Sequence, residues 1–410
     1  MTKGTIINIP RRFVKDEWGG TETVITETAH QLKSIGYRLE SVTTLALSNN
    51  KHECIFGIPV KRFNYSYTRL GLSKKHRLLL DKRGGNMFSL PLFFYLIFSK
   101  NIRIIHLHTM GRLGALARIA ARLKGIPYVV SIHGGYLGLP KEQLDDMMQP
   151  LKGSFNWGKP FDLLIQSAKV IEGADAVICV GENEREKIAA KYPQQKVIYL
   201  PNGVDQQRFA SGNACAFMSK YHFSETDKII LCVSSFTPQK NQQTLLRAFA
   251  KAHKHSPELK LVLIGVIYDQ DYFDLLENLR KELGLQQDVR FIINLKFDDP
   301  SLANAYAAAE LFVLPSLYEP FGIVVLESWA SGTPVLCGNV GGLPSFVTNG
   351  ENGLFFDVES VDCLCQKMLS ILQNKLLYKY IQSHALKAVE TYSWQAISKR
   401  LANLYEEISS

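Results

Sequence analysis

The sequence predicts two successive α/β domains, each built on a doubly wound parallel sheet, and three observations lead to that prediction. The chain has 410 residues, which is enough for two or three domains of ordinary size. Short apolar runs alternate along the chain with segments of helical periodicity, a pattern typical of parallel strands joined by crossover helices. The pattern breaks near residues 201–225 and then starts again, which divides the chain into two halves.

The expected elements follow in chain order. In the first half we expect strands at residues 5–9, 39–43, 102–107, 128–132 and 176–180, with helices at 21–35 and 114–123. After a break we expect a strand at 196–200, followed by a turn. A second series begins with a strand at 229–233 and continues with strands at 259–264, 289–293, 311–314 and 334–336 and helices at 242–253 and 272–283.

The last segment, residues 393–408, has the periodicity of an amphipathic helix. One of its faces is apolar and comprises Trp394, Ile397, Leu401, Leu404 and Ile408. We therefore predict a first domain of residues 1–203, completed by residues 393–410, and a second domain of residues 204–392. Ligands of such folds bind at the carboxyl ends of the strands, so we expect a cleft between the two sheets.

The composition is that of a soluble globular protein, with 46% hydrophobic and 21% charged residues. The start of the chain lacks the apolar core of a signal peptide. The seven cysteines are scattered, and no pair of CxxC motifs suggests zinc. These features favour reduced thiols and a cytoplasmic location.

Charge is distributed unevenly along the chain. Residues 1–203 contain 29 Lys and Arg against 16 Asp and Glu, whereas the rest of the chain is slightly acidic. A basic half attracts phosphates, anionic lipids or nucleic acid, but the charges are dispersed and no recognition motif for nucleic acid appears.

The densest basic cluster, residues 74–83, directly precedes the apolar run of residues 87–98. That run is too short to span a bilayer as a helix. The favoured interpretation is a buried helix, and the alternative is a surface segment that dips into a membrane. A basic segment beside an apolar one suits an anionic membrane surface, although a solvated loop explains the charges equally well.

The most specific motif is the segment of residues 314–327, LPSLYEPFGIVVLE. An apolar strand ends at its leucine, a Pro-Ser loop follows, and a helical pattern begins at the glycine. Glu319 therefore lies in a loop at the carboxyl end of a strand, where it can accept hydrogen bonds from sugar hydroxyls, and Glu327 lies in the helix, where it can accept them from a ribose diol. The amides at the helix start form an anion site, and they belong to Phe321, Gly322 and Ile323.

This segment resembles the E-x7-E signature of the retaining glycosyltransferases of family 4, which have the GT-B fold of two Rossmann-like domains facing across a cleft. The resemblance implies that Glu319 holds the donor sugar, that the next amides hold the diphosphate, and that Glu327 holds the ribose. It extends over most of the chain in further blocks: Gly19-Gly20-Thr-Glu22, the hinge-like LPNGVD of residues 200–205, the glycine-rich residues 332–353, and TYSW at residues 391–394.

Lys240 matches the lysine of the Arg-x4-Lys element with which this family neutralises the donor diphosphate. The position of the arginine is occupied by Ser235, so one charge-assisted contact is missing. Ser345 is a second departure, because the family commonly has glutamate there. The resemblance thus gives a donor-binding set of Gly19, Gly20, Ser235, Lys240, Glu319, Phe321, Gly322, Ile323 and Glu327.

His133 follows the expected strand at residues 128–132 and precedes two glycines. It resembles the His-Gly segment of the family, which lies near the transferred sugar, and there an imidazole can donate a hydrogen bond to an oxygen that gains charge. The alternative is a capping or core histidine. His106 and His108 end the preceding strand, and we expect one to face the cleft and the other to pack, because side chains alternate along a strand.

The sequence thus predicts a retaining glycosyltransferase of hexosyltransferase type, with His133, Glu319 and Lys240 as catalytic residues. It would move a sugar from a nucleotide-sugar donor to a glycan or glycolipid acceptor, in the synthesis of cell-surface polysaccharide or lipopolysaccharide. No cofactor or metal is expected, because Lys240 and the amides after Glu319 can stabilise the leaving phosphate and no Asp-x-Asp motif occurs. The expected location is the cytoplasm, with attachment to the inner face of the membrane left open.

Two other functions remain open at this point. A nucleotide-sugar epimerase shares the two-domain fold, and the serine at position 235 gives some weight to a non-catalytic nucleotide-sugar-binding protein. A dehydrogenase is disfavoured, since neither half has a GxGxxG motif after its first strand.

Overall fold

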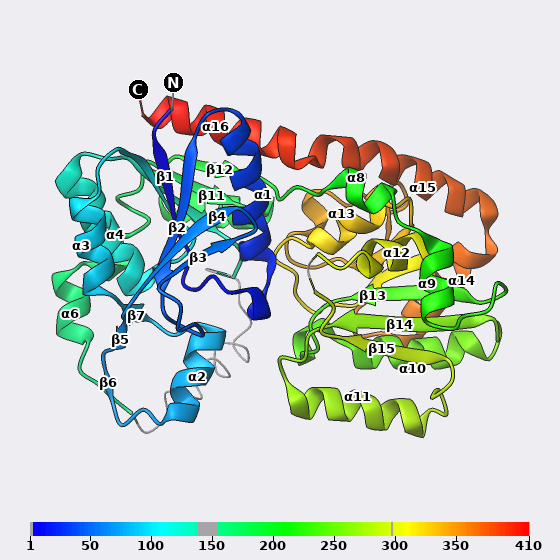
Figure 1. The fold of residues 1–410 in the computed structure, drawn as a ribbon. Coiled ribbons are helices and arrows are strands. Elements are labelled where there is room, and N and C mark those ends of the chain that lie inside the picture. Colours follow the sequence, from blue (N-terminus) through cyan, green and yellow to red (C-terminus); the bar gives the residue numbers. More distant parts are fainter. Residues whose placement is uncertain (1–2, 136, 138–153, 297, 410) are drawn as a thin grey trace. The chain divides into compact units, whose positions relative to one another are not determined.

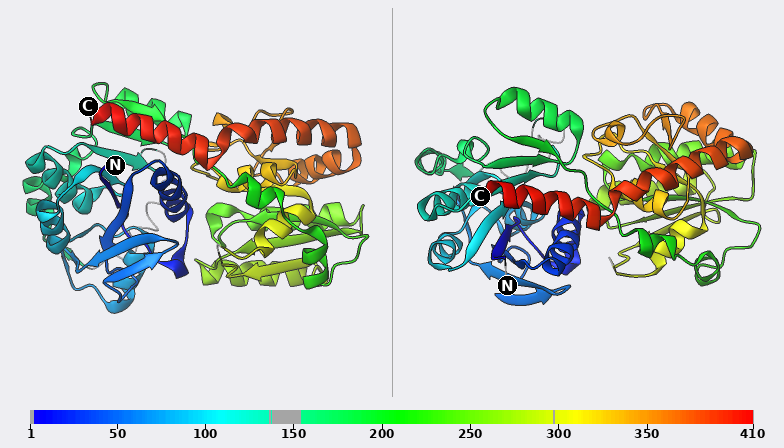
Figure 2. Two further views of the ribbon diagram at one scale, coloured as in Figure 1. Left: turned by 45° about the horizontal axis from the view of Figure 1, so that its top comes forward. Right: turned by 90° about the horizontal axis from the view of Figure 1, so that it is seen from above.

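The computed structural model describes residues 3–135, 137, 154–296 and 298–409. The chain forms two compact units, one of residues 1–202 and 394–410 and the other of residues 203–393. These limits differ by one residue at each boundary from those expected. Both units are drawn in Figures 1 and 2.

The first unit contains an eight-stranded sheet in the order β12-β11-β9-β8-β1-β2-β4-β3. Its neighbouring strands are parallel except for β3, which pairs antiparallel with β4 at the sheet edge. The strands are β1 (Thr5–Ile9), β2 (Arg38–Thr44), β3 (His52–Ile55), β4 (Ile58–Phe63), β8 (Ile102–Leu107), β9 (Tyr128–Ile132), β11 (Ala176–Cys179) and β12 (Val197–Tyr199). Two small ribbons pair β5 (Ser66–Tyr67) with β7 (Met87–Phe88) and β6 (Arg69–Leu70) with β10 (Phe155–Asn156).

Helices cover both faces of this sheet (Figure 1). They are α1 (Gly20–Ser34), α2 (Lys74–Arg83), α3 (Leu90–Phe98), α4 (Gly111–Lys124), α6 (Lys159–Leu164), α7 (Glu182–Lys191) and α16 (Trp394–Ile408). Apolar side chains of α3 and α4 share one core with the sheet, and those of α1 and α16 share another. The last helix therefore completes the first unit, as predicted, and its Tyr405 is fully buried there.

The antiparallel β3–β4 hairpin was not expected from the sequence. Its turn, Phe56-Gly57, has φ values of 45° and 76°, so a non-glycine residue takes a left-handed conformation that the sequence does not signal. Burial alternates along β4 and places Ile58, Val60 and Arg62 inward, and the buried arginine interrupts the apolar alternation by which a sequence indicates a strand.

The apolar run of residues 87–98 forms β7 and then α3, and only part of it is buried. The hydroxyl of Ser89 caps α3 by accepting a hydrogen bond of 3.2 Å from the amide of Leu92. Leu92 and Leu96 are buried, whereas Phe94 is 51% and Phe98 76% exposed. The expected buried helix is thus buried on one face and open on the other.

The second unit contains a six-stranded parallel sheet in the order β15-β14-β13-β16-β17-β18. The strands are β13 (Lys228–Val233), β14 (Leu259–Gly265), β15 (Val289–Ile293), β16 (Ala309–Leu314), β17 (Val335–Gly338) and β18 (Leu354–Phe356). The helices are α8 (Gln206–Ala210), α9 (Ala214–Lys220), α10 (Gln242–His253), α11 (Gln270–Glu282), α12 (Ser301–Ala308), α13 (Ile323–Ala330), α14 (Val361–Gln373) and α15 (Lys375–Val389). The strand order reverses direction between β13 and β16, which is where a doubly wound sheet offers its ligand site.

Within the described residues, no helix is both long enough and apolar enough to cross a membrane. All seven cysteines are free thiols.

Candidate active site

The loop between β16 and α13 carries Glu319, as predicted, and glycines allow its tight course. Gly322 has a φ of +92°, and a β-carbon there would lie 2.8 Å from the side chain of Leu343. A second glycine, Gly341, approaches from the next loop so closely that a β-carbon on it would lie 2.0 Å from the carbonyl oxygen of Glu319. Larger residues would therefore displace the backbone that carries Glu319.

Lys240 and Glu319 form the central ion pair of this site. The ammonium of Lys240 donates to Oε2 of Glu319 at 2.6 Å, and the hydroxyl of Ser316 donates to the same oxygen at 3.2 Å. The two charged side chains are only 17% and 10% exposed. Lys240 ends a short 3-10 helix, Pro238–Lys240, which is held to the loop because Gln239 donates to the carbonyl oxygen of Tyr318 at 2.8 Å.

The amides that follow Glu319 offer an anion site beside this pair. The backbone N–H groups of Phe321 and Gly322 donate to no described residue, and Ile323 begins α13. The ring of Phe321 is buried and stacks on Phe346 at 4.7 Å between centroids, so only its backbone is available to a ligand. Unpaired amides at a helix start next to a lysine are suited to bind a diphosphate.

Glu327 lies on α13, and its carboxylate has a partner that the sequence analysis missed. The hydroxyl of Tyr306, on α12, donates to Oε2 of Glu327 at 2.8 Å. Burial raises the pKa of Glu327, while the Tyr306 hydrogen bond and the charge of Arg208 lower it. Tyr306 lies outside the motif of residues 314–327, and no sequence pattern marked it.

Ser235 lies just beyond β13, in the loop before Lys240. Its carbonyl oxygen accepts a hydrogen bond of 2.9 Å from Gln242, the first residue of α10. Its half-buried side chain carries no charge, so among the residues matched to the family's phosphate-binding element Lys240 is the cation that remains.

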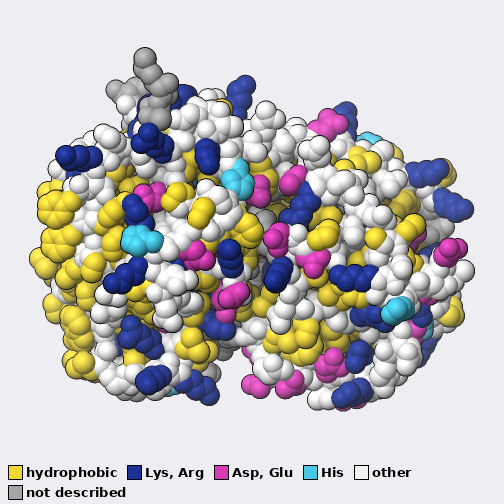
Figure 3. Space-filling model, viewed as in Figure 1, with side chains coloured by type: hydrophobic (Ala, Val, Ile, Leu, Met, Phe, Trp, Pro, Cys, Tyr) yellow, Lys and Arg dark blue, Asp and Glu magenta, His cyan; other side chains and the backbone are white. Residues whose placement is uncertain are grey.

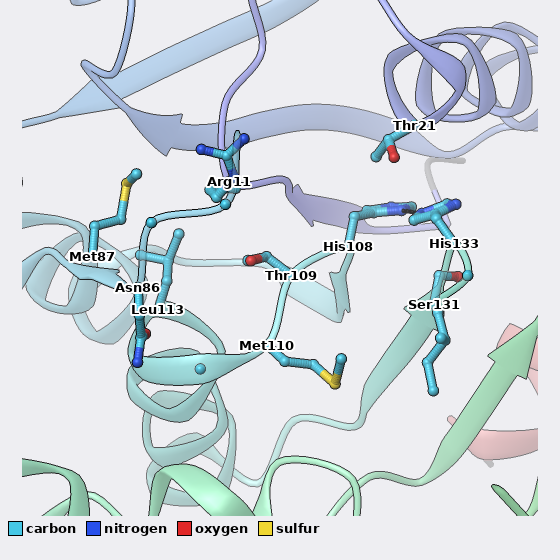
Figure 4. Close-up of a pocket in the computed structure, with 15 residues that line it drawn as sticks. Arg11, Thr21, Asn86, Met87, His108, Thr109, Met110, Leu113, Ser131 and His133 are labelled. Atoms are coloured by element: carbon cyan, nitrogen blue, oxygen red, sulfur yellow. Dashed lines mark hydrogen bonds between the residues drawn. The ribbon is translucent and has the colours of Figure 1, made fainter. Parts of the chain in front are cut away.

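His133 belongs to the first unit and lines a cavity of about 330 Å³ there (Figure 4). The cavity lies at the carboxyl ends of β1, β8 and β9. Its lining includes Arg11, Thr21, Asn86, His108, Thr109, Ser131 and His133. Burial lowers the pKa of His133 to about 4, so its imidazole is neutral at pH 7.

His106 and His108 take different positions, but alternation is not the reason. Residues two apart lie on the same side of a strand, and their rings are 4.1 Å apart. His106 is buried between the hydroxyls of Tyr405 and Ser131, at 2.6 and 2.7 Å. His108 follows the end of β8 and lines the cavity. The different positions of the two histidines therefore do not arise from the alternation of side chains along the strand, and that part of the expectation was wrong.

Gly19 and Gly20 lie at the start of α1 in the first unit, next to the cavity-lining Thr21. Gly19 is in an extended conformation with φ of −147°, which other residues also adopt. Nearby Glu22 is buried, and desolvation raises its pKa even though Arg12 lies 4.0 Å away. The candidate residues thus form two groups, one in each unit, and each unit places its own group at the carboxyl ends of its strands.

Two parallel-sheet α/β units, with a Lys–Glu pair that joins two segments of the second unit beside unpaired amides, are the features of a GT-B glycosyltransferase. The comparisons with known proteins agree. Residues 18–208 match the model of Glycosyltransferase Family 4, and residues 216–388 match that of Glycosyl transferases group 1. The chain belongs to the group 1 glycosyltransferases and is an enzyme of that class. This membership favours a transferase over the epimerase and the non-catalytic binding protein.

Two relatives are similar to this chain in sequence, and one solved structure is similar to it in fold. An uncharacterized glycosyltransferase of Methanocaldococcus jannaschii is 30% identical, over 70% of this chain and 72% of the relative. A D-inositol 3-phosphate glycosyltransferase of Corynebacterium glutamicum is 27% identical, and the match spans 58% of this chain and 59% of that relative's length. The structure of Anabaena HepE in complex with UDP and glucose is 20% identical with a TM-score of 0.72, covering 98% of this chain and all of that one.

Proposed function

We propose that this enzyme transfers a sugar from a nucleoside diphosphate sugar to an acceptor hydroxyl with retention of anomeric configuration. The observation that carries the proposal is the Lys240–Glu319 pair beside the unpaired amides of Phe321 and Gly322. A lysine and free amides suit a diphosphate, and a carboxylate beside them suits sugar hydroxyls. That Anabaena HepE was crystallised with UDP and glucose supports a donor of this class.

In the proposed reaction, the bond between the anomeric carbon and the phosphate oxygen breaks as a bond to the acceptor oxygen forms. The leaving diphosphate gains negative charge, which Lys240 and the amides stabilise, and it takes the proton of the acceptor hydroxyl. Glu319 holds the hydroxyls of the sugar and Glu327 holds the ribose. We propose that the reaction requires no metal, because these groups supply the positive charge that the leaving group needs.

For the acceptor we propose a glycan or a lipid-linked sugar, in the synthesis of cell-surface polysaccharide or lipopolysaccharide, with the first unit binding at an anionic membrane surface. The support is an apolar surface on that unit, visible along the edge formed by α3 and α6 in Figure 3. We call it the α3–α6 surface, and its exposed side chains are Leu90, Phe94, Phe98, Leu163 and Leu164. Exposed Lys100 and Lys159 lie at ends of the same helices, and α2 adds a basic cluster in the same unit. Apolar side chains flanked by cations suit a bilayer with anionic headgroups.

The donor proposal is tested by a thermal-shift panel of nucleotide sugars on the wild type, Glu319→Ala and the exposed control Glu351→Ala. A donor that binds the folded state raises the unfolding midpoint. We expect one nucleotide sugar to stabilise the wild type and Glu351→Ala, and to stabilise Glu319→Ala clearly less. A panel in which no nucleotide sugar shifts the wild type would overturn the donor proposal.

A further inference from the structure

Three side chains form a hydrogen-bonded row across the carboxyl ends of β1, β8 and β9. Nε2 of His108 lies 3.1 Å from Oδ1 of Asn8, and Nδ1 of His108 lies 2.8 Å from Nε2 of His133. The two imidazole rings are nearly parallel, with 16° between their planes and 5.1 Å between their centroids. Figure 4 shows both histidines side by side at the edge of the cavity. The row exists because β8 lies between β1 and β9 in the sheet.

The donor and the acceptor of each hydrogen bond in this row follow from the amide oxygen of Asn8, which can only accept. A neutral imidazole carries one N–H and one lone pair, so each ring donates once and accepts once. The oxygen of Asn8 accepts, which puts the proton of His108 on Nε2 and leaves its Nδ1 as an acceptor. Because Nδ1 of His108 accepts, Nε2 of His133 must donate to it and therefore carries the proton of that ring. The remaining nitrogen of His133, Nδ1, then carries a lone pair, and no described residue is bonded to it.

The neutral state of both rings agrees with their surroundings. Desolvation lowers the pKa of His133, and desolvation together with the neighbouring histidines lowers that of His108. His106 stacks on His108 but does not belong to the row, because Tyr405 and Ser131 occupy both of its nitrogens.

We infer that Asn8 and His108 are positioning residues that hold His133 as its Nε2–H tautomer, so that Nδ1 accepts a hydrogen bond from a ligand hydroxyl. The ligand class is a sugar, and this identification rests on the proposed function, whereas the tautomer rests on the row alone. The resemblance of the sequence to the family implied instead that His133 donates to an oxygen that gains charge. In the row, the one proton of His133 is already used by His108, so its free nitrogen serves a hydroxyl instead.

The tautomer is tested on the ligand-free full chain labelled with 15N-histidine, with His133 assigned by the signals that disappear in His133→Gln. Long-range proton–nitrogen spectra report which ring nitrogen is protonated. We expect His133 to carry its proton on Nε2 and to show Nδ1 in the unprotonated range. A proton on Nδ1 would overturn the inference whether or not the enzyme transfers sugar, and a failed donor panel would leave this measurement unaffected.

The positioning role is tested with His108→Gln and His108→Phe. Glutamine can donate to Asn8 and accept from His133, whereas phenylalanine keeps a flat ring without nitrogens. With the donor found in the panel, we expect kcat/KM to fall about tenfold in His108→Phe, the effect of one lost hydrogen bond, and His108→Gln to stay close to the wild type. Equal losses in both variants at unchanged unfolding midpoints would overturn a role through hydrogen bonding. The exposed histidine of β3 supplies the control, His52→Phe, which we expect to leave kcat/KM unchanged.

Discussion

The ammonium group of Lys240 lies 2.6 Å from a carboxylate oxygen of Glu319, although 78 residues separate them in the chain. The pair is largely shielded from water, and each member neutralises the other in the ligand-free enzyme. If the proposed donor binds here, its diphosphate would compete with Glu319 for the lysine, and the pair would link donor binding to the position of the Glu319 carboxylate.

Replacing Lys240 by methionine removes the cation of this pair. We expect kcat/KM to fall about a hundredfold or more, because preorganised charge on a leaving group commonly contributes that much. The control is Lys251→Met, which breaks a surface pair with Asp362 in the same unit and should leave transfer unchanged. Steady-state kinetics measures kcat/KM in both variants, and equal losses would contradict a role for Lys240 in stabilising the leaving group.

Ser235→Arg restores the residue type that the family uses at this position. We expect the dissociation constant for the nucleoside diphosphate to fall about tenfold at low salt, since an arginine adds a charge-assisted contact. The gain should shrink as salt screens the new charge. Isothermal titration calorimetry measures it, with Ser235→Gln as a control for size. An arginine variant that binds no tighter than the glutamine variant would speak against a phosphate near this loop.

Tyr306→Phe removes the hydroxyl that donates to Glu327. Because that hydrogen bond lowers the pKa of Glu327, its loss raises the pKa further. An ionised carboxylate accepts hydrogen bonds from a ribose more strongly than a protonated one. Nucleotide affinity should therefore fall with decreasing pH, and in the variant the fall should begin at a higher pH. Binding of UDP measured against pH tests this, with Tyr378→Phe as control. Superimposable curves for wild type and Tyr306→Phe would contradict it.

Gly322→Ala tests the strain in the loop that carries Glu319. An alanine at a φ of +92° is strained, and its β-carbon would also meet Leu343 at 2.8 Å. Gly350 has a φ of +82° and open space around it, so Gly350→Ala isolates the strain from the clash. We expect a loss of about 1–2 kcal/mol in the free energy of unfolding for Gly350→Ala and a larger loss for Gly322→Ala. Urea unfolding compares them, and equal losses would show that the loop accommodates the added carbon.

The α3–α6 surface is tested by co-sedimentation with lipid vesicles. Phe94→Ser combined with Phe98→Ser removes two exposed rings from α3, and we expect binding to anionic vesicles to fall about tenfold or more. Leu376→Ser, an 83% exposed leucine of the second unit, should have no effect. Binding by the wild type should weaken in neutral vesicles and at high salt. Failure of the wild type to sediment with anionic vesicles would contradict membrane binding, and concentration-dependent self-association would point to a second copy of the chain instead.

Much of the fold could be predicted because buried parallel strands are continuous apolar runs. The strands β1, β8, β9 and β15 and the helix α10 have the bounds expected from the sequence. The β3–β4 hairpin was not predicted because it lies at a sheet edge, where mixed polar and apolar residues give a weaker sequence pattern for a strand. The sequence also could not show which face of α3 is exposed, because a wholly apolar run does not distinguish a buried face from an exposed one.

The family, the two-domain α/β architecture and the positions of Glu319 and Glu327 on either side of a helix start could all be predicted from the sequence. These features follow from local patterns and short motifs, which can be recognised without knowledge of long-range contacts. Three contacts could be identified only in the folded chain: Lys240 with Glu319, Tyr306 with Glu327, and the row of Asn8, His108 and His133. Each of these contacts joins side chains from different segments of the fold, which the packing of strands, loops and helices brings together irrespective of their spacing in the chain.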